Sequence, residues 1–123
     1  MDLSPEVHAF IAESISSVEM LEVLLLLHRA PDTYWGVPAI SHQLGLKEEL
    51  VRTATQRLAE HHLVATSHTT DAYRFEADEG RTATTDALAD AYRDQRIQVI
   101  NTIYSENLRR LRAFSDAFRI RGE

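Results

Sequence analysis

The stretch Val37–Val64, VPAISHQLGLKEELVRTATQRLAEHHLV, decides the fold because it holds two helix-forming segments joined at a glycine. Gly45 suits the left-handed backbone that ends a helix, so it predicts a turn between a short helix, 39–44, and a helix that begins near Lys47. Apolar side chains occupy the positions around this turn where a helix-turn-helix needs its core. They are Ile40, Leu44, Leu46, Val51 and Ala54. The spacing predicts a helix-turn-helix.

The second helix of this pair has an apolar side and a polar side. Leu50, Val51, Ala54 and Leu58 recur at helical spacing, so we expect all four to face the core. The helix is expected to end near His61 and His62. The side chains expected to face solvent are Arg52, Thr53, Gln56 and Arg57.

Two helix starts precede this stretch. Ser4 can cap a helix whose first turn holds Pro5, and its apolar stripe consists of Val7, Phe10, Ile11 and Ile15. Ser16 and Glu19 have the spacing of a capping box for a second helix, about 17–29. That helix is apolar on almost every side, which predicts a buried central helix.

The segment 32–36 is expected to be a linker, and it carries Tyr34 and the single tryptophan, Trp35. Large aromatic side chains are mostly buried, so we expect both to lean on the core. The alternative is an exposed contact surface.

A short β-hairpin is expected after the second helix. Residues 64–67 and 72–75 are rich in β-branched and aromatic side chains, and 69–71 supply a turn. The predicted fold class is therefore mostly α, with a short two-stranded β-hairpin and long N- and C-terminal helices.

A buried helix, a helix-turn-helix with LGL at its turn, a Leu63-Val64 pair and a hairpin together resemble the winged-helix domain of MarR-like bacterial transcription regulators. The resemblance covers residues 17–76. It implies that the second helix of the motif enters the DNA major groove and that the hairpin wing touches the backbone or minor groove. The DNA-contacting residues that it implies are Ser41, Gln43, Lys47, Arg52, Thr53, Gln56, Arg57, His68 and Arg74.

The charges in this region are balanced, and the whole chain has a net charge of −6. Segment 37–75 holds four basic residues, Lys47, Arg52, Arg57 and Arg74. It also holds four acidic ones, Glu48, Glu49, Glu60 and Asp71. Since phosphate contacts supply most non-specific affinity, such a surface binds DNA weakly unless the fold separates the charges or a dimer doubles the contacts.

The segment 82–104 is expected to form one long helix with two apolar stripes. One stripe holds Leu88, Tyr92, Val99 and Ile103, and it is expected to pack on the winged helix. The other is the expected homodimer interface, and its residues are Ile97, Ile100, Tyr104, Leu108 and Leu111. Alternatively, the second stripe receives the N-terminal helix of the same chain.

The tail, 107–121, combines five arginines with Leu108, Leu111, Phe114 and Phe118. We expect it to dock by its aromatic side chains, with its arginines facing the acidic N-terminal region, where 1–30 holds five acids and one arginine. Basic amphipathic helices also bind membranes or nucleic acid, which is the alternative.

Nothing in the sequence favours an enzyme, a metal site or a cofactor. His42, His61, His62 and His68 lack the spacing of a zinc site, and there is no phosphate-binding loop or nucleophile motif. A ligand pocket between the terminal helices and the winged helix would be lined by Tyr34, Trp35, Tyr92 and Tyr104.

We expect a single domain, 1–123, divided into an N-terminal helix (1–16), a winged-helix core (17–76) and C-terminal helices for dimerisation (77–123). The absence of cysteine, of a leader and of a long apolar run favours a cytoplasmic protein without a membrane partner. Two hypotheses follow. The first is a homodimeric regulator that binds double-stranded DNA, and the second is a winged-helix module that binds a protein and no longer binds DNA.

Overall fold

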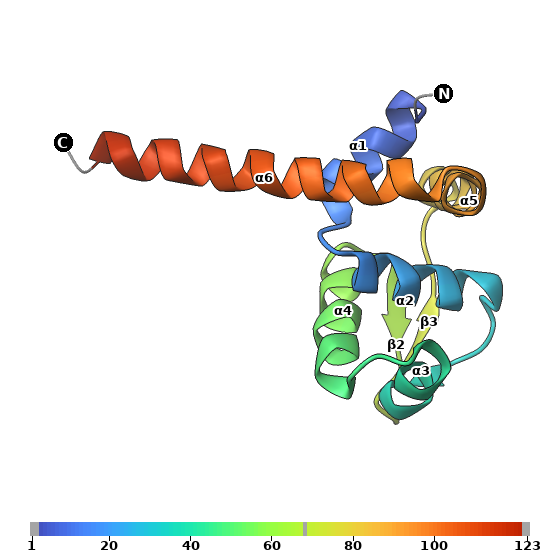
Figure 1. Ribbon diagram of the computed structural model, residues 1–123. Coiled ribbons are helices and arrows are strands. Elements are labelled where there is room, and N and C mark those ends of the chain that lie inside the picture. Colours follow the sequence, from blue (N-terminus) through green and yellow to red (C-terminus); the bar gives the residue numbers. More distant parts are fainter. Residues whose placement is uncertain (1–2, 68, 122–123) are drawn as a thin grey trace.

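The computed structural model describes residues 3–67 and 69–121, with side chains to residue 116. It is mostly helical, with a small three-stranded antiparallel sheet of order β1-β3-β2 (Figure 1). The helices are α1 (Pro5–Ser14), α2 (Val18–Arg29), α3 (Val37–Leu44), α4 (Glu48–Glu60), α5 (Glu79–Asp94) and α6 (Arg96–Arg121). The strands are β1 (Trp35–Gly36), β2 (Val64–Thr66) and β3 (Ala72–Phe75).

Helix α2 is the buried centre of the fold, as its composition predicted. It contacts α3, α4, α5 and β3. Its buried side chains are Met20, Leu21, Val23, Leu24, Leu26 and Leu27. The predicted capping box is wrong, because Ser17 rather than Ser16 has the extended backbone of the N-cap and its hydroxyl accepts the Met20 N–H at 3.0 Å.

The turn between α3 and α4 forms at the predicted glycine. Gly45 has φ 67°, and its N–H donates to the carbonyl oxygen of Ser41. On α4, Val51 and Leu58 are fully buried, but the prediction that Leu50 faces the core is wrong, since it is 44% exposed. The buried arc centres on Val51 and Leu58, about 20° apart on the helical wheel, and therefore includes Thr55 instead.

Helix α4 ends through a second left-handed residue. His62 has φ 59°, which is uncommon for a residue with a side chain. This conformation reverses the chain so that the N–H of Leu63 donates to the carbonyl oxygen of Leu58. Leu63 thereby returns to the core, where it is fully buried.

The sheet has one strand more than the sequence predicted. β2 and β3 form the expected hairpin, and Val64 lies opposite Phe75. The segment that was expected to be a linker contains β1, in which Trp35 pairs with Tyr73. This strand was not predicted because its partner lies far along the chain and gives no local sequence signal. Trp35 is partly buried as expected, whereas Tyr34 is 46% exposed and does not lean on the core.

A second layer, formed by α1, α5 and α6, lies above α2 in Figure 1. Ser4 caps α1, as predicted, by accepting the Val7 N–H at 3.3 Å. The predicted apolar stripe of α1 is buried, and so are Leu88 of α5 and Val99 and Ile103 of α6. These residues join one core with those of α2.

The expected single helix 82–104 is wrong, because the helix breaks at Gln95, which has φ −136° and ψ 49°. A straight helix would place Leu88 and Ile103 about 22 Å apart along its axis. The break turns α6 across the end of α5, so that α1 packs against both (Figure 1). No glycine or proline marks the break in the sequence.

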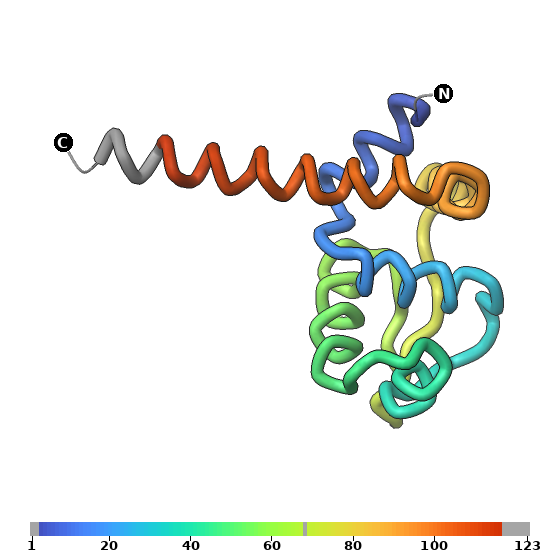
Figure 2. Tube along the Cα trace, in the orientation of Figure 1, coloured from blue at the N-terminus to red at the C-terminus, as the bar shows by residue number. Residues whose placement is uncertain are grey.

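Helix α6 extends to Arg121, and after Leu111 it projects beyond α1 and α4 (Figure 2). The expectation that the tail docks by its aromatic side chains is wrong for Phe114, which is 69% exposed, and the neighbouring Leu108 is 57% exposed. The side chain of Phe118 lies outside the described residues. The alternative that α1 covers the second stripe is also wrong, because Ile97 and Tyr104 are 75% and 60% exposed. Instead, α1 lies along the side of α6 that carries Glu106, to which His8 is bonded at 2.8 Å.

No helix among the described residues is both long enough and apolar enough to span a membrane.

Substitutions at the two left-handed residues, Gly45 and His62, are predicted to change the free energy of unfolding in opposite directions. Gly45→Ala lowers the free energy of unfolding by about 1–2 kcal/mol, because a Cβ would meet no atom within 4 Å and only the backbone conformation resists it. His62→Gly raises that free energy by up to about 1 kcal/mol, because it relieves the same backbone cost. Urea unfolding followed by circular dichroism measures both, and changes of equal sign would contradict the assignment.

Candidate nucleic-acid interface

The exposed side of α4 carries four of the nine predicted DNA-contacting residues. Arg52, Thr53, Gln56 and Arg57 are all exposed, as the sequence predicted. The buried side of the helix rests on α2, so its orientation is set by the core. A rigid helix that presents polar side chains outward can enter a groove in a partner.

The charges on this side of α4 are arranged unfavourably for a phosphate backbone. At about 100° per residue, Glu49, Thr53, Gln56 and Glu60 fall within about 60° of one another, opposite the buried side. Both carboxylates are exposed. The two arginines flank this central line instead of occupying it.

Arg52 lies on one flank and pairs with the turn of the hairpin. Its guanidinium is 2.8 Å from a carboxylate oxygen of Asp71, and both side chains are at least half exposed. An exposed pair of this kind contributes at most about 1 kcal/mol, so Arg52 can exchange Asp71 for another anion. The pair links α4 to the segment that joins β2 and β3.

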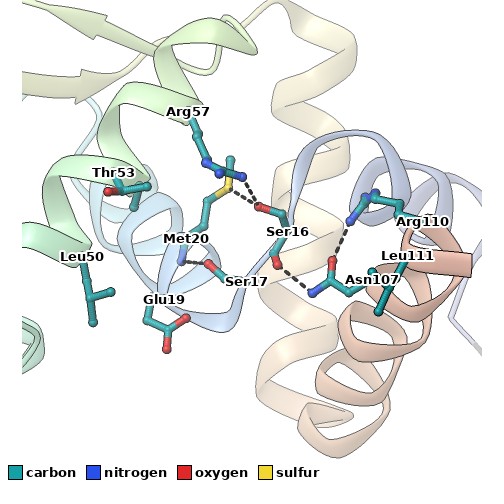
Figure 3. A pocket seen from close by; sticks show the side chains of 11 residues that line it. Ser16, Ser17, Glu19, Met20, Leu50, Thr53, Arg57, Asn107, Arg110 and Leu111 are labelled. Carbon is teal, nitrogen blue, oxygen red and sulfur yellow. Dashed lines mark hydrogen bonds between the residues drawn. The ribbon is translucent and has the colours of Figure 1, made fainter. Parts of the chain in front are cut away.

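Arg57 lies on the other flank and reaches the linker between α1 and α2 (Figure 3). It donates to the Ser16 hydroxyl at 3.2 Å, and Asn107 of α6 donates to the Ser16 carbonyl oxygen at 2.8 Å. Arg110 donates to Asn107 at 2.7 Å and also to the carbonyl oxygen of Ala12. Ser16 therefore joins α4 to α6.

The other predicted contact residues are dispersed around α4. Gln43 and Lys47 are exposed near the helix-turn-helix turn, but Ser41 donates its hydroxyl to the Leu46 carbonyl oxygen and so helps to close that turn. Arg74 lies over the ring of Tyr34, 5.3 Å from its centroid. His68 lies outside the described residues.

The structure thus brings Arg52, Thr53, Gln56 and Arg57 onto one helix beside the hairpin turn, with Lys47 at the N-cap of that helix. Three features of this region were not predicted from the sequence. They are the Arg52–Asp71 pair, the Ser16 contacts with α4 and α6, and the exposure of Leu50. The Arg52–Asp71 pair and the Ser16 contacts join segments that are remote in sequence. The helix-capping pattern around Ser16 was the only local sequence signal for either of them.

A separate cavity of about 760 Å³ lies between α2 and α5, where Tyr92, one of the four predicted pocket residues, forms part of the wall. Leu25, Leu26 and Leu44 supply apolar walls, and Arg96 lies over the Tyr92 ring at 4.7 Å from its centroid. Burial raises the pKa of Tyr92, the carboxylate of Glu22 raises it further, and Arg96 opposes both effects.

Within the described part of the chain, no group of three or more possible ligands could hold a metal ion.

Comparisons with family models, with curated proteins and with solved structures found no match to this chain.

The Tyr92 phenol is expected to ionise above its ordinary pKa of 10.0. Glu22→Gln removes a neighbouring negative charge and should lower that pKa, whereas Glu19→Gln, on the same helix, serves as the control. Because the fold favours the neutral phenol, its stabilising contribution is present below pH 10 and is lost as the pH rises through the raised pKa. Spectrophotometric titration against Tyr92→Phe measures the value, and a pKa below 10.0 would contradict the burial described above.

Proposed function

We propose that this chain is a winged-helix DNA-binding protein that acts as a homodimer, in the manner of a transcription regulator. The observation that carries the proposal is the arrangement of α2, β1, α3, α4, β2 and β3, with β1 paired to β3 and the polar side of α4 facing outward beside the hairpin. This is the order in which a winged helix presents its recognition helix and wing. The unpredicted strand β1 strengthens the likeness.

In this proposal, α4 enters the major groove. Gln56 suits bidentate contact with adenine and Thr53 suits either hydrogen-bonding sense, and both lie on the central line of the exposed side. Glu49 would repel phosphate but can accept from the amino group of cytosine. Arg52 and Arg57 flank this line, where the phosphate strands would pass, and Lys47 lies at the N-cap of the helix.

A homodimer makes such binding stronger. One helix with balanced charge offers few phosphate contacts, and a twofold pair doubles them. The exposed apolar residues of α6, including Ile97, Tyr104 and Leu111, support self-association because contiguous exposed apolar side chains mark interaction surfaces.

The second candidate function is a winged-helix module that binds a protein. The observation that favours it is the pair of carboxylates, Glu49 and Glu60, on the central line of the exposed side of α4. The flanking arginines also have partners within the chain, in Asp71 and Ser16. A basic protein surface would fit this helix better than a phosphate backbone does.

Selection from random duplex DNA with the purified chain, followed by titration at several salt concentrations, tests the proposal. Arg52→Ala with Arg57→Ala should weaken binding at least 10-fold and reduce the magnitude of the salt slope by about 2, since two phosphate contacts are lost. Arg29→Ala with Arg93→Ala removes the same charge from exposed positions on α2 and α5 and is the matched control. If no sequence is enriched, or if both double variants bind alike, the protein-binding candidate replaces the regulator.

A further inference from the structure

Arg57 of α4 and Arg110 of α6 bind only neutral acceptors among the described residues. Arg57 donates to the Ser16 hydroxyl, and Arg110 donates to the Asn107 side chain and to the carbonyl oxygens of Ile11 and Ala12. None of the ion pairs in the described ranges uses either arginine. Both guanidiniums are therefore able to bind an anion.

The two arginines line one pocket of about 620 Å³ between α4 and α6. They lie on either side of Ser16 (Figure 3). Thr53 and Asn107 supply further polar groups to the lining. The volume falls within the range of about 300–1,000 Å³ that is usual for small-molecule sites.

The remaining wall of the pocket is apolar. Leu50 and Ala54 line it from α4, and Met20 lines it from α2. Leu50 is 44% exposed, so a solute can reach this wall from water, and the unbranched methionine side chain adapts readily to a ligand. Leu111 lies at the α6 end of the pocket, but the proposed dimer already uses it, so we assign the ligand contacts to the other three residues.

The carboxylates around the pocket do not cancel its positive charge. Among the described residues that line it, Glu19 carries the single carboxylate, and its side chain points away from both guanidiniums (Figure 3). Glu13 and Glu60 line the adjoining cavity, which the two arginines also border, but neither carboxylate forms an ion pair with them. The pocket itself thus has two positive charges against one negative charge, which favours an anionic ligand.

We propose that this pocket binds an alkyl carboxylate, a small anion with an aliphatic chain. Its carboxylate accepts hydrogen bonds from Arg57 and Arg110, and its chain lies against the apolar wall. A carboxylate is a stronger acceptor for a guanidinium than a neutral hydroxyl is, so the ligand replaces Ser16 as the acceptor of Arg57. A phosphate ion would satisfy the same arginines but would leave the apolar wall uncovered.

The ligand competes with DNA for two side chains of the recognition helix. In the proposed function Arg57 contacts phosphate and Thr53 contacts a base, and both residues line the pocket. A bound carboxylate holds Arg57 and covers Thr53, so the ligand releases the chain from DNA. Coupling between two ligands is reciprocal, so DNA weakens the binding of the carboxylate by the same factor. This competition rests on the proposed function, whereas the ligand site does not.

Equilibrium dialysis of octanoate against the full chain, without DNA, tests the ligand site. Acetate lacks the aliphatic chain and 1-octanol lacks the charge, so each should bind at least about 10-fold more weakly than octanoate does. Arg57→Gln and Arg110→Gln should each weaken octanoate binding by about 10-fold, because each variant loses a charge-assisted hydrogen bond. Arg112→Gln removes the same charge from an exposed position of α6 outside the pocket and should bind octanoate as the unsubstituted chain does.

Leu50→Ser provides a test that does not depend on the interhelical hydrogen bonds of Arg110. Leu50 is already partly exposed, so this variant should keep the circular dichroism of the unsubstituted chain while binding octanoate more weakly. The ligand site would be overturned if octanoate showed no saturable binding. It would also be overturned if Arg57→Gln and Leu50→Ser both bound octanoate as tightly as the unsubstituted chain.

A DNA titration in the presence of octanoate tests the competition. At ten times its dissociation constant, octanoate should weaken DNA binding by about 10-fold, and 1-octanol should have no effect. DNA binding that octanoate leaves unchanged would overturn the competition. A chain that binds octanoate as described but binds no DNA would contradict the regulator and the competition, and it would support the ligand site.

Discussion

The structure depends on the burial of α2. Leucine side chains on almost every side of this helix are removed from water, and each contributes about 1.5–3 kcal/mol. Helices α3, α4 and α5 and strand β3 all contact α2. The orientation of α4, and with it the direction in which Arg52 and Gln56 face, follows from the packing of α4 against α2, α3 and β2. The candidate interface is thus a property of the core as much as of its own polar residues.

Much of the fold could be predicted from the sequence because its signals are local. The continuous apolar composition of α2, Gly45 at the turn and the β-branched residues of the hairpin each act within a few neighbouring residues. The left-handed His62 also follows a local rule, since the chain must reverse there although glycine is absent. These features involve short-range sterics and hydrogen bonds, which periodicity and turn chemistry describe well.

The rest depends on contacts between segments distant in sequence. Trp35 of strand β1 pairs with Tyr73, and the break at Gln95 lets α1 pack against both α5 and α6. Prediction of the candidate site from the sequence is limited in the same way, because its contacts also join distant segments. Periodicity placed Arg52 and Arg57 on the outside of α4, but their partners, Asp71 and Ser16, became evident only in three dimensions. Those partners and the central carboxylates weaken the simplest form of the DNA hypothesis.

One α2-centred core positions α4, and we propose that the projecting part of α6 is covered by a second copy of the chain. Amide hydrogen exchange at several protein concentrations tests it most directly. We expect the amides of Leu24 and Leu27 to exchange only through global unfolding, and those of residues 107–116 to become more protected as the concentration rises. Local opening of α2, or protection of 107–116 that does not depend on concentration, would contradict the claim.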